Sequence, residues 1–249
     1  MSEYASISEY LPPTYGTHLP GGMTAIEWAP APRWPMEHRN VRALHGAIST
    51  ICGHGHRRWP SFTIRRHGDA WAVYWSDEAT AARVAGASID GMLFDRPTTF
   101  RIGPLFRMRA PSDLGKGIRT VRIDTLSPVV ISCYGRTVVR ECPTDDSLMS
   151  SISGEILYRL SPSHCDEHPK SDPWARWMKE SIKIKLVSYH THVKSVSLGG
   201  KFGSIPGWAG KLFVECNAPA HWVLVALERG LGLGGRTAFG FGQIRVTPC

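Results

Sequence analysis

A glycine-rich stretch near the end of the chain, residues 227–246, constrains the fold more than any other segment. Six glycines occupy the thirteen positions from Gly230 to Gly242. An apolar run with helical character, residues 218–227, precedes them, and an alternating apolar run, residues 239–246, follows. The order therefore predicts a helix, a glycine-rich turn and a final strand.

Two phosphate-binding motifs nearly match this stretch. Gly230-x-Gly232-x-x-Gly235 has the spacing of the dinucleotide fingerprint, and Arg236 and Thr237 complete a near P-loop in which arginine replaces lysine. Both motifs need a strand before the glycines and a helix after them, so that the helix N-terminus meets the phosphate. Here that order is reversed, so neither nucleotide nor dinucleotide binding is predicted, and no cofactor is expected.

The same glycines leave the backbone bare, which allows positive φ and the close approach of a ligand. Successive amides can form an anion-binding concavity for a phosphodiester backbone. A tight turn, with glycines needed only for packing, is an equally consistent interpretation. The residues expected to contact phosphate here are Arg229, Gly232, Gly234, Gly235, Arg236 and Arg245.

The composition favours a nucleic acid as the partner. The net charge is +8, and 21 arginines outnumber 8 lysines. Arginine's planar fork binds phosphate in a bidentate manner and stacks on bases, so an arginine-rich basic surface is typical of nucleic-acid binders. The alternative is that the charge serves solubility alone.

Cysteine usage and hydropathy bear on the compartment. The six cysteines form no C-x-x-C pair, and no secretory leader is evident, which together predict reduced thiols and a cytoplasmic protein. No apolar run reaches the ~18 residues that a membrane span requires, so no membrane association is expected.

The first half of the chain predicts the pattern β-α-β-β-α-β, which is the ferredoxin-like plan. Residues 1–22 are expected to be an irregular arm, and residues 23–110 the first domain. The first helix is expected over 36–51, and a hairpin is expected to turn at His67-Gly68-Asp69. A second helix over 79–89 and a strand over 99–108 complete the pattern. Pro111 to Gly117 is a predicted linker.

The second half, residues 118–249, repeats the plan. A strand is expected within 119–133, helices over 146–160 and 173–180, and a long hairpin over 182–196 and 211–216. The connection of that hairpin is expected to contain Gly199, Gly200, Gly203 and Gly207. The predicted fold class is α+β, with two tandem ferredoxin-like (RRM-like) domains.

The glycine stretch resembles the C-terminal signature of the RAMP superfamily, in particular the CRISPR repeat-processing endoribonucleases. In that signature two Gly-hydrophobic-Gly arms are separated by a few residues. Gly230-Leu231-Gly232 and Gly240-Phe241-Gly242 supply both arms. The step Leu126-Ser127-Pro128 is similar to one in the first strand of the family's second domain. Departures from common members hint at a divergent, type IV branch.

The resemblance implies metal-independent cleavage of CRISPR precursor RNA within the repeat, with retention of the stem-loop product. The 2′-hydroxyl attacks the neighbouring phosphate and leaves a 2′,3′-cyclic phosphate. The implied partners are repeat RNA, guide RNA and other subunits of a CRISPR ribonucleoprotein complex. The alternative is a non-catalytic RAMP-fold subunit that binds guide RNA.

Such a reaction needs a base, an acid and positive charge, which histidine and arginine supply. Leu44-His45 is similar to the step that carries the catalytic histidine in stem-loop-cutting members, so His45 is the first candidate for the base. Arg42, three residues earlier, shares its helix face, and Arg39 lies on a nearby face. A histidine packed in the core is the alternative. Catalysis by positive charge alone, through arginines, is another.

A second candidate pair of acid–base residues is His54 and His56, which flank Gly55. A His-x-His step can also bind a metal, but no third and fourth ligands accompany it at suitable spacing, so no metal site is predicted.

Other arginines put positive charge on the first domain, where it can follow the shape and phosphates of an RNA stem. Alternation along the predicted strand places Arg101, Arg107 and Arg109 on one face. Solvated sheet residues are the alternative interpretation. The further arginines expected to bind RNA are Arg33, Arg57, Arg58, Arg65, Arg66 and Arg107.

Overall fold

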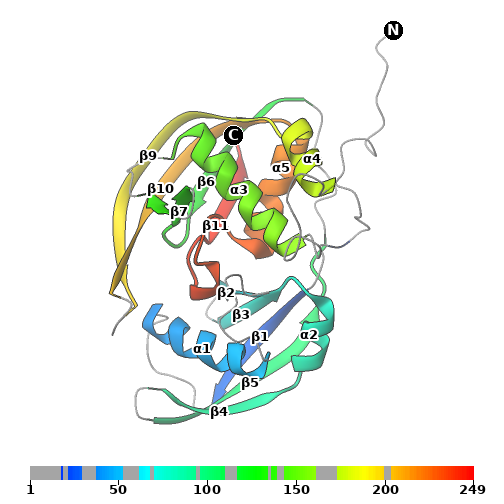
Figure 1. Cartoon of the computed structure of the whole chain (residues 1–249), viewed down its shortest axis with the longest axis vertical. Helices are drawn as coiled ribbons and strands as arrows, with labels where there is room; N and C mark the ends of the chain where they lie inside the picture. The colour runs from blue at the N-terminus through cyan, green and yellow to red at the C-terminus, as the bar shows by residue number, and fades with distance from the viewer. Residues whose placement is uncertain are drawn as a thin grey trace.

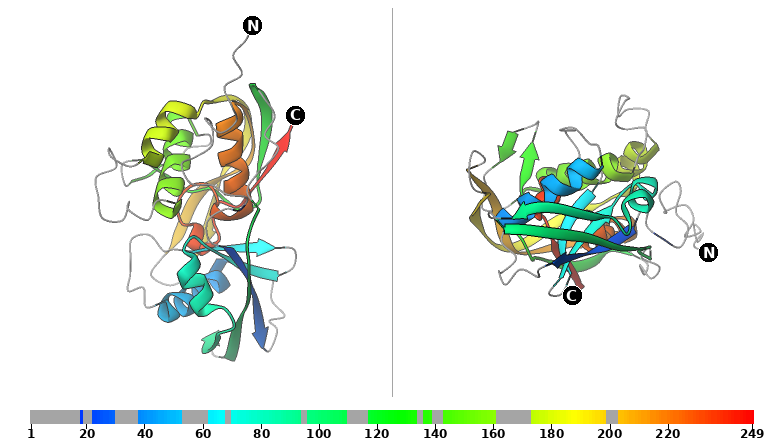
Figure 2. Two further views of the ribbon diagram at one scale, coloured as in Figure 1. Left: turned by 90° about the vertical axis from the view of Figure 1, so that its right-hand side faces the viewer. Right: turned by 90° about the horizontal axis from the view of Figure 1, so that it is seen from below.

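The computed structural model describes residues 18, 22–29, 38–52, 62–67, 70–93, 96–109, 117–133, 136–138, 143–160, 173–198 and 203–249. Within these ranges the chain forms two large antiparallel sheets, each accompanied by helices. The two sheet-and-helix units are stacked along the long axis of the molecule (Figures 1 and 2).

The first unit follows the ferredoxin-like order along the chain. Its sheet has the strand order β2-β3-β1-β5-β4, in which every neighbouring pair is antiparallel. Its elements are β1 (Gly22–Ala29), α1 (His38–Ile51), β2 (Phe62–His67), β3 (Ala70–Trp75), α2 (Glu78–Val84), β4 (Ser88–Leu93) and β5 (Arg96–Phe106).

Helix α1 packs on this sheet because its apolar residues recur at helical spacing. Val41, Leu44 and Ile48 are buried in one cluster with the sheet residues Phe62 and Ile64. The stripe leaves the next helix face, which carries Arg42 and His45, at the margin of the core.

The predicted second helix is too long. Helix α2 ends at Val84, and β4, which the sequence pattern did not predict, begins at Ser88. Gly86 has a φ of 81°, a conformation that ends the helix and that glycine adopts without strain. Strand β5 also ends at Phe106, so Arg107 and Arg109 lie beyond it, and the expected single face of Arg101, Arg107 and Arg109 is not formed.

The second unit has the sheet order β11-β6-β10-β9. Its helices lie on one side of this sheet in Figure 2. Its elements are β6 (Arg119–Thr125), the small hairpin β7 (Ile131–Cys133) and β8 (Arg136–Val138), α3 (Asp145–Leu160), α4 (Pro173–Ser181), β9 (Ile184–Ser197), β10 (Ser204–Cys216), α5 (Ala218–Ala226) and β11 (Ile244–Pro248).

Two predicted boundaries in this unit are wrong. Gly207 lies inside β10, not in a turn, because it pairs with Lys194 in the ladder between β10 and β9. The last strand begins at Ile244, because Phe239 belongs to a short 3-10 turn. The predicted fold class, α+β with two tandem ferredoxin-like sheets, is confirmed.

Candidate functional site

The glycine-rich segment lies at the junction of the two units, between α5 and β11 (Figure 1). It begins with a π-helical turn, η4 (Leu227–Leu231), and contains a 3-10 turn, η5 (Thr237–Phe239). Leu231 and Leu233 belong to the core cluster of the second unit, whereas Ala238 is buried in that of the first. The segment is therefore anchored in both cores.

Close packing explains why two of these positions are glycine. A Cβ on Gly230 would lie 2.8 Å from Cγ of Tyr74, a fully buried residue of β3. Gly242 has a φ of 74°, and a Cβ there would lie 3.0 Å from the Leu233 carbonyl carbon. Side chains at these positions would push the first unit away or break the turn.

Several amides of the segment donate hydrogen bonds within the protein. The amide of Gly232 donates to the Leu227 carbonyl (2.8 Å), and that of Gly235 donates to the Val130 carbonyl (2.7 Å). Gly234 lies against the same Val130 carbonyl. These two amides are engaged, so the geometry favours the packing interpretation at Gly232, Gly234 and Gly235. Their contact with RNA stays a prediction.

His45 lies where the segment meets the first unit. Its ring stacks on Phe239, with centroids 4.2 Å apart and an interplanar angle of 17°, and Phe62 of β2 lies at 5.4 Å with a tilt of 46°. The side chain is half-buried. His45 is therefore packed against aromatic rings and still partly open to solvent. This position is consistent both with a histidine packed in the core and with a catalytic base.

Arg42 links the same helix to the second unit. Its Nη1 donates to the carbonyl of Leu198, the residue after β9, at 3.3 Å. The β9–β10 hairpin curves along the molecule toward α1 (Figure 1). The predicted catalytic role of Arg42 is untested, but at least part of its guanidinium connects α1 to this hairpin. Arg39 lies in α1, and its side chain falls outside the described residues, as do His54, His56, Arg33, Arg57 and Arg58.

Arg236 precedes η5 and has an unusual backbone. Its φ of 64° is the only positive value at a non-glycine among the residues described. The side chain is exposed, while the next two residues, Thr237 and Ala238, are buried. Its carbonyl accepts the Phe239 amide at 2.8 Å. Strain of this kind recurs at functional sites. Among the arginines predicted to contact phosphate, Arg236 is therefore the strongest candidate.

Another group of predicted arginines lies around Glu228 and fastens the two units together. Arg65 Nη2 donates to the Glu228 carbonyl, and Arg229 donates to the Arg109 carbonyl. Burial lowers the pKa of Arg65 to about 10. Burial also raises the pKa of Glu228, although an N–H from Val246 and the charges of Arg65, Arg229 and Arg245 oppose the shift.

At least part of the Arg65 guanidinium is therefore engaged at the junction, and its predicted contact with RNA stays a prediction. The amide of Arg66 donates to Oε1 of Gln243 at 3.1 Å, while the side chain of Arg66 and that of Arg245 on β11 are exposed.

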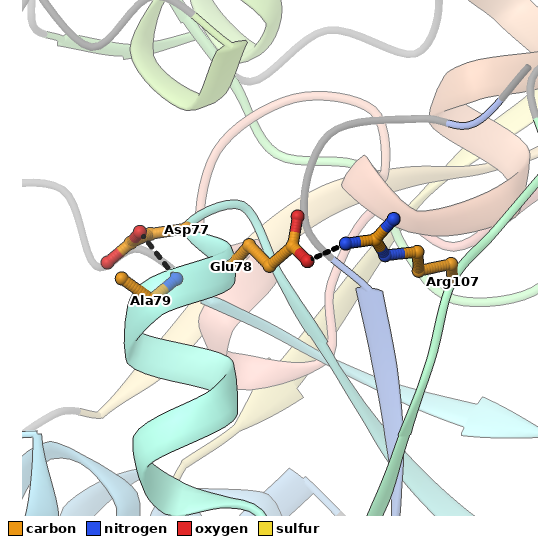
Figure 3. Close-up of polar contacts among 4 residues, drawn as sticks. All are labelled: Asp77, Glu78, Ala79 and Arg107. Carbon is orange, nitrogen blue, oxygen red and sulfur yellow. Dashed lines mark hydrogen bonds and ion pairs between the residues drawn. The ribbon is translucent and has the colours of Figure 1, made fainter. Parts of the chain in front are cut away.

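Arg107 has a partner within the first unit. It forms an exposed ion pair with Glu78 in the first turn of α2 (Figure 3). An exposed pair of this kind is weak, so RNA phosphate can compete for Arg107, and its predicted role stays a prediction.

Sequence reasoning missed Phe239 and Gln243. Alternation placed Phe239 on a strand, whereas the structure places it in η5 with its ring against His45 of α1. The buried Gln243 accepts from Arg66, and its Nε2 donates to the Gly240 carbonyl at 3.2 Å. The available signal was a polar glutamine between the glycine and apolar residues of this segment.

Within the described ranges, no group of three or more His, Cys, Asp or Glu side chains is placed to hold a metal ion. The helices described there are also too short or too polar to cross a bilayer.

The chain is similar to known proteins in its structure, and the sequence comparisons find no match. The sequence matches no model of a protein family. It also matches no curated protein. Solved structures do match. A Cas6 in complex with a substrate mimic is 16% identical with a TM-score of 0.56, covering 93% of this chain and 100% of that one. Thermus thermophilus Cas6 is 13% identical with a TM-score of 0.56, covering 94% of this chain and 100% of that one.

A partial Cas6-RT-Cas1–Cas2 complex also matches, with 10% identity and a TM-score of 0.50, over 92% of this chain and 46% of that one. The chain thus has the tandem ferredoxin-like fold that is seen in Cas6 structures.

Proposed function

We propose that the protein is an endoribonuclease that cuts CRISPR precursor RNA within the repeat, by metal-independent attack of a 2′-hydroxyl, and keeps the stem-loop product. One observation carries the proposal. His45 and the strained, exposed Arg236 are brought to the same junction by α1 and η5, which pack against each other. The Cas6 fold and the +8 charge support it.

In this mechanism His45 removes the proton from the 2′-hydroxyl, and the resulting oxygen attacks the adjacent phosphorus. The bond from phosphorus to the 5′-oxygen breaks, which leaves a 2′,3′-cyclic phosphate. The 5′-oxygen takes a proton, for which His54 or His56 is our candidate donor. Arg236 and Arg42 stabilise the negative charge that develops on the phosphate.

The partners follow from the same proposal. We infer that the chain binds CRISPR repeat RNA and acts with other CRISPR proteins, since one structural neighbour is a Cas6 in an assembly with Cas1 and Cas2. Exposed basic side chains near the junction, such as Arg66 and Arg245, are the expected contacts to RNA phosphates.

The test is cleavage of a repeat-containing RNA stem-loop in excess EDTA. We expect wild type to cut it, a 2′-deoxy nucleotide at the cut site to block cleavage, and His45→Ala to slow it by roughly 10²–10⁴-fold, the loss typical of a missing general base. His190→Ala removes an exposed histidine from β9 in the second unit and serves as the matched control, with no expected effect.

The second candidate is a guide-RNA-binding subunit that does not cut. The half-buried position of His45 between two aromatic rings favours it, since a packed histidine has such surroundings. Tight binding of the stem-loop without any cleavage by wild type would replace the first proposal with this one. Cleavage that His45→Ala leaves unchanged would keep the reaction and assign it to the arginines.

A further inference from the structure

We propose that Phe239 is a positioning residue, whose ring holds the imidazole of His45 in the orientation needed for proton abstraction. The glycine-rich segment then acts on catalysis through an aromatic contact, in addition to any contact it makes with RNA. The inference rests on the proposed function, because it concerns the reaction assigned there to His45.

The geometry of the two rings is the first step. At 4.2 Å and 17°, the phenyl ring covers one face of the imidazole almost in parallel, and Phe62 approaches at a tilt. The ring torsion of histidine is intrinsically broad, so packing against these rings restricts which way each nitrogen points. A base must lie within hydrogen-bond reach of its proton, and a displacement of about 1 Å can cost roughly 10²-fold in rate.

The position of Phe239 is itself fixed by the backbone. Its amide donates to the Arg236 carbonyl at 2.8 Å, and the amide of Gly240 donates to the Thr237 carbonyl at 3.0 Å. Thr237 and Ala238 are buried, so the turn cannot rotate freely. A rigid turn that presents one half-buried phenyl ring is suited to holding a neighbouring side chain.

The contact also joins opposite ends of the chain. His45 is supplied by α1 of the first unit, whereas Phe239 follows the last helix of the second. The imidazole is therefore clamped only when the two units are docked and the glycine-rich segment is seated. This arrangement couples the docking of the units to the competence of the base.

A double-mutant cycle tests the proposal. Single-turnover cleavage is compared in wild type, Phe239→Leu, His45→Ala and the double variant. We expect Phe239→Leu to slow cleavage about 10²-fold with the Kd for RNA unchanged, and to have no further effect once His45 is absent. Phe239→Tyr keeps the ring and should restore the rate. Phe106→Leu, at a phenylalanine that is 58% exposed on β5, is the control without effect.

An independent readout is the NMR spectrum of the His45 ring, assigned by its loss in His45→Ala. The ring protons should be shifted upfield by the face of Phe239 in wild type, and this shift should vanish in Phe239→Leu. An active wild type in which Phe239→Leu cuts normally, or slows cleavage equally with and without His45, overturns the inference alone. A wild type that binds the stem-loop without cutting overturns the proposed function as well.

Discussion

The backbone of Arg236 lowers the stability of the protein, whereas its side chain is proposed to speed cleavage. Its φ of 64° costs a non-glycine residue about 1–2 kcal/mol. Replacing it with glycine removes that strain. Glycine also raises the entropy of the unfolded chain, which lowers the free energy of unfolding by about 0.4–1 kcal/mol. We therefore expect Arg236→Gly to be as stable as wild type, or slightly more stable, in a denaturant titration. Cleavage should nevertheless fall by roughly 10²–10³-fold, as for other lost charge-stabilising groups.

Asparagine tolerates the same backbone conformation, so Arg236→Asn should behave like Arg236→Gly in both measurements. Arg236→Lys keeps the charge but loses the planar fork, and an intermediate rate is expected. Clear destabilisation of the glycine variant, or cleavage at the wild-type rate, would show that the conformation is kept for folding and not for the reaction.

His221 makes the second unit sensitive to acid. It is buried in α5, and its Nδ1 lies 3.4 Å from Nη1 of Arg119. Burial first, and then the charge of Arg119, lower the pKa of His221 in the folded protein below 6.5. Below that pH the unfolded chain binds a proton that the folded protein does not, so stability falls with decreasing pH, by at most about 1.4 kcal/mol per pH unit.

Unfolding free energies from pH 7 to pH 5 check this, with His221→Gln as the comparison. Glutamine keeps a hydrogen-bond acceptor but cannot be protonated in this range, so the difference between the two proteins should grow as the pH falls. Subtraction cancels the other groups, including Glu228, whose raised pKa acts in the opposite sense. Parallel curves would exclude His221 as the acid-sensitive group.

At the residue level, the sequence predicts chemistry better than it predicts location. His45 is found at the junction because its position on an amphipathic helix places it next to the apolar stripe. For Arg65 the sequence predicts a cation on a strand of the first domain, but it does not show which segment covers that side chain. The surface that covers it is η4, which comes from the other end of the chain.

Helix α2 is an element whose start depends on one side chain. Asp77 accepts hydrogen bonds from the amides of Ala79 and Thr80, each at 3.1 Å (Figure 3 draws the first). Although burial acts to raise it, these bonds and one from the Thr80 hydroxyl hold the pKa of Asp77 below its ordinary value. We expect Asp77→Ala to lower the free energy of unfolding by about 1 kcal/mol and Asp77→Asn to retain most of it. Urea midpoints decide, and equal losses in both variants would contradict capping.

Among the elements, periodicity locates long segments and misses those defined by distant partners. Helix α1 and the two strands of the β2–β3 hairpin are close to their predicted bounds, because the apolar residues of each recur at the period of the face that it buries in the core. Strand β4 is missed because it exists through pairing with β5. The glycine-rich turn is predicted in its place along the chain, but the carbonyl of Val130 that receives the Gly235 amide lies far away in sequence.

Over the whole molecule, the docking of the two units depends on a close backbone approach at Gly230. Tyr74 belongs to the sheet of the first unit but is buried in the core cluster of the second. A methyl group at Gly230 would meet its ring, which cannot turn aside because the residue is fully buried. We expect Gly230→Ala to destabilise the protein by about 1–3 kcal/mol, the usual range for overpacking. It should also abolish the ring-current shift of His45, as Phe239 moves with the displaced segment.

The matched control is Gly46→Ala. Gly46 follows His45 in α1 and is itself exposed. A Cβ there has nothing within 4 Å, so alanine should stabilise the helix by about 0.5–1 kcal/mol and leave cleavage unchanged. Thermal unfolding, the NMR shift of His45 and single-turnover cleavage are measured on both variants. If Gly230→Ala lowers stability but keeps the shift and the cleavage rate, the two units dock independently of this contact. Joint loss of all three would show that one backbone approach holds the units and the base in place together.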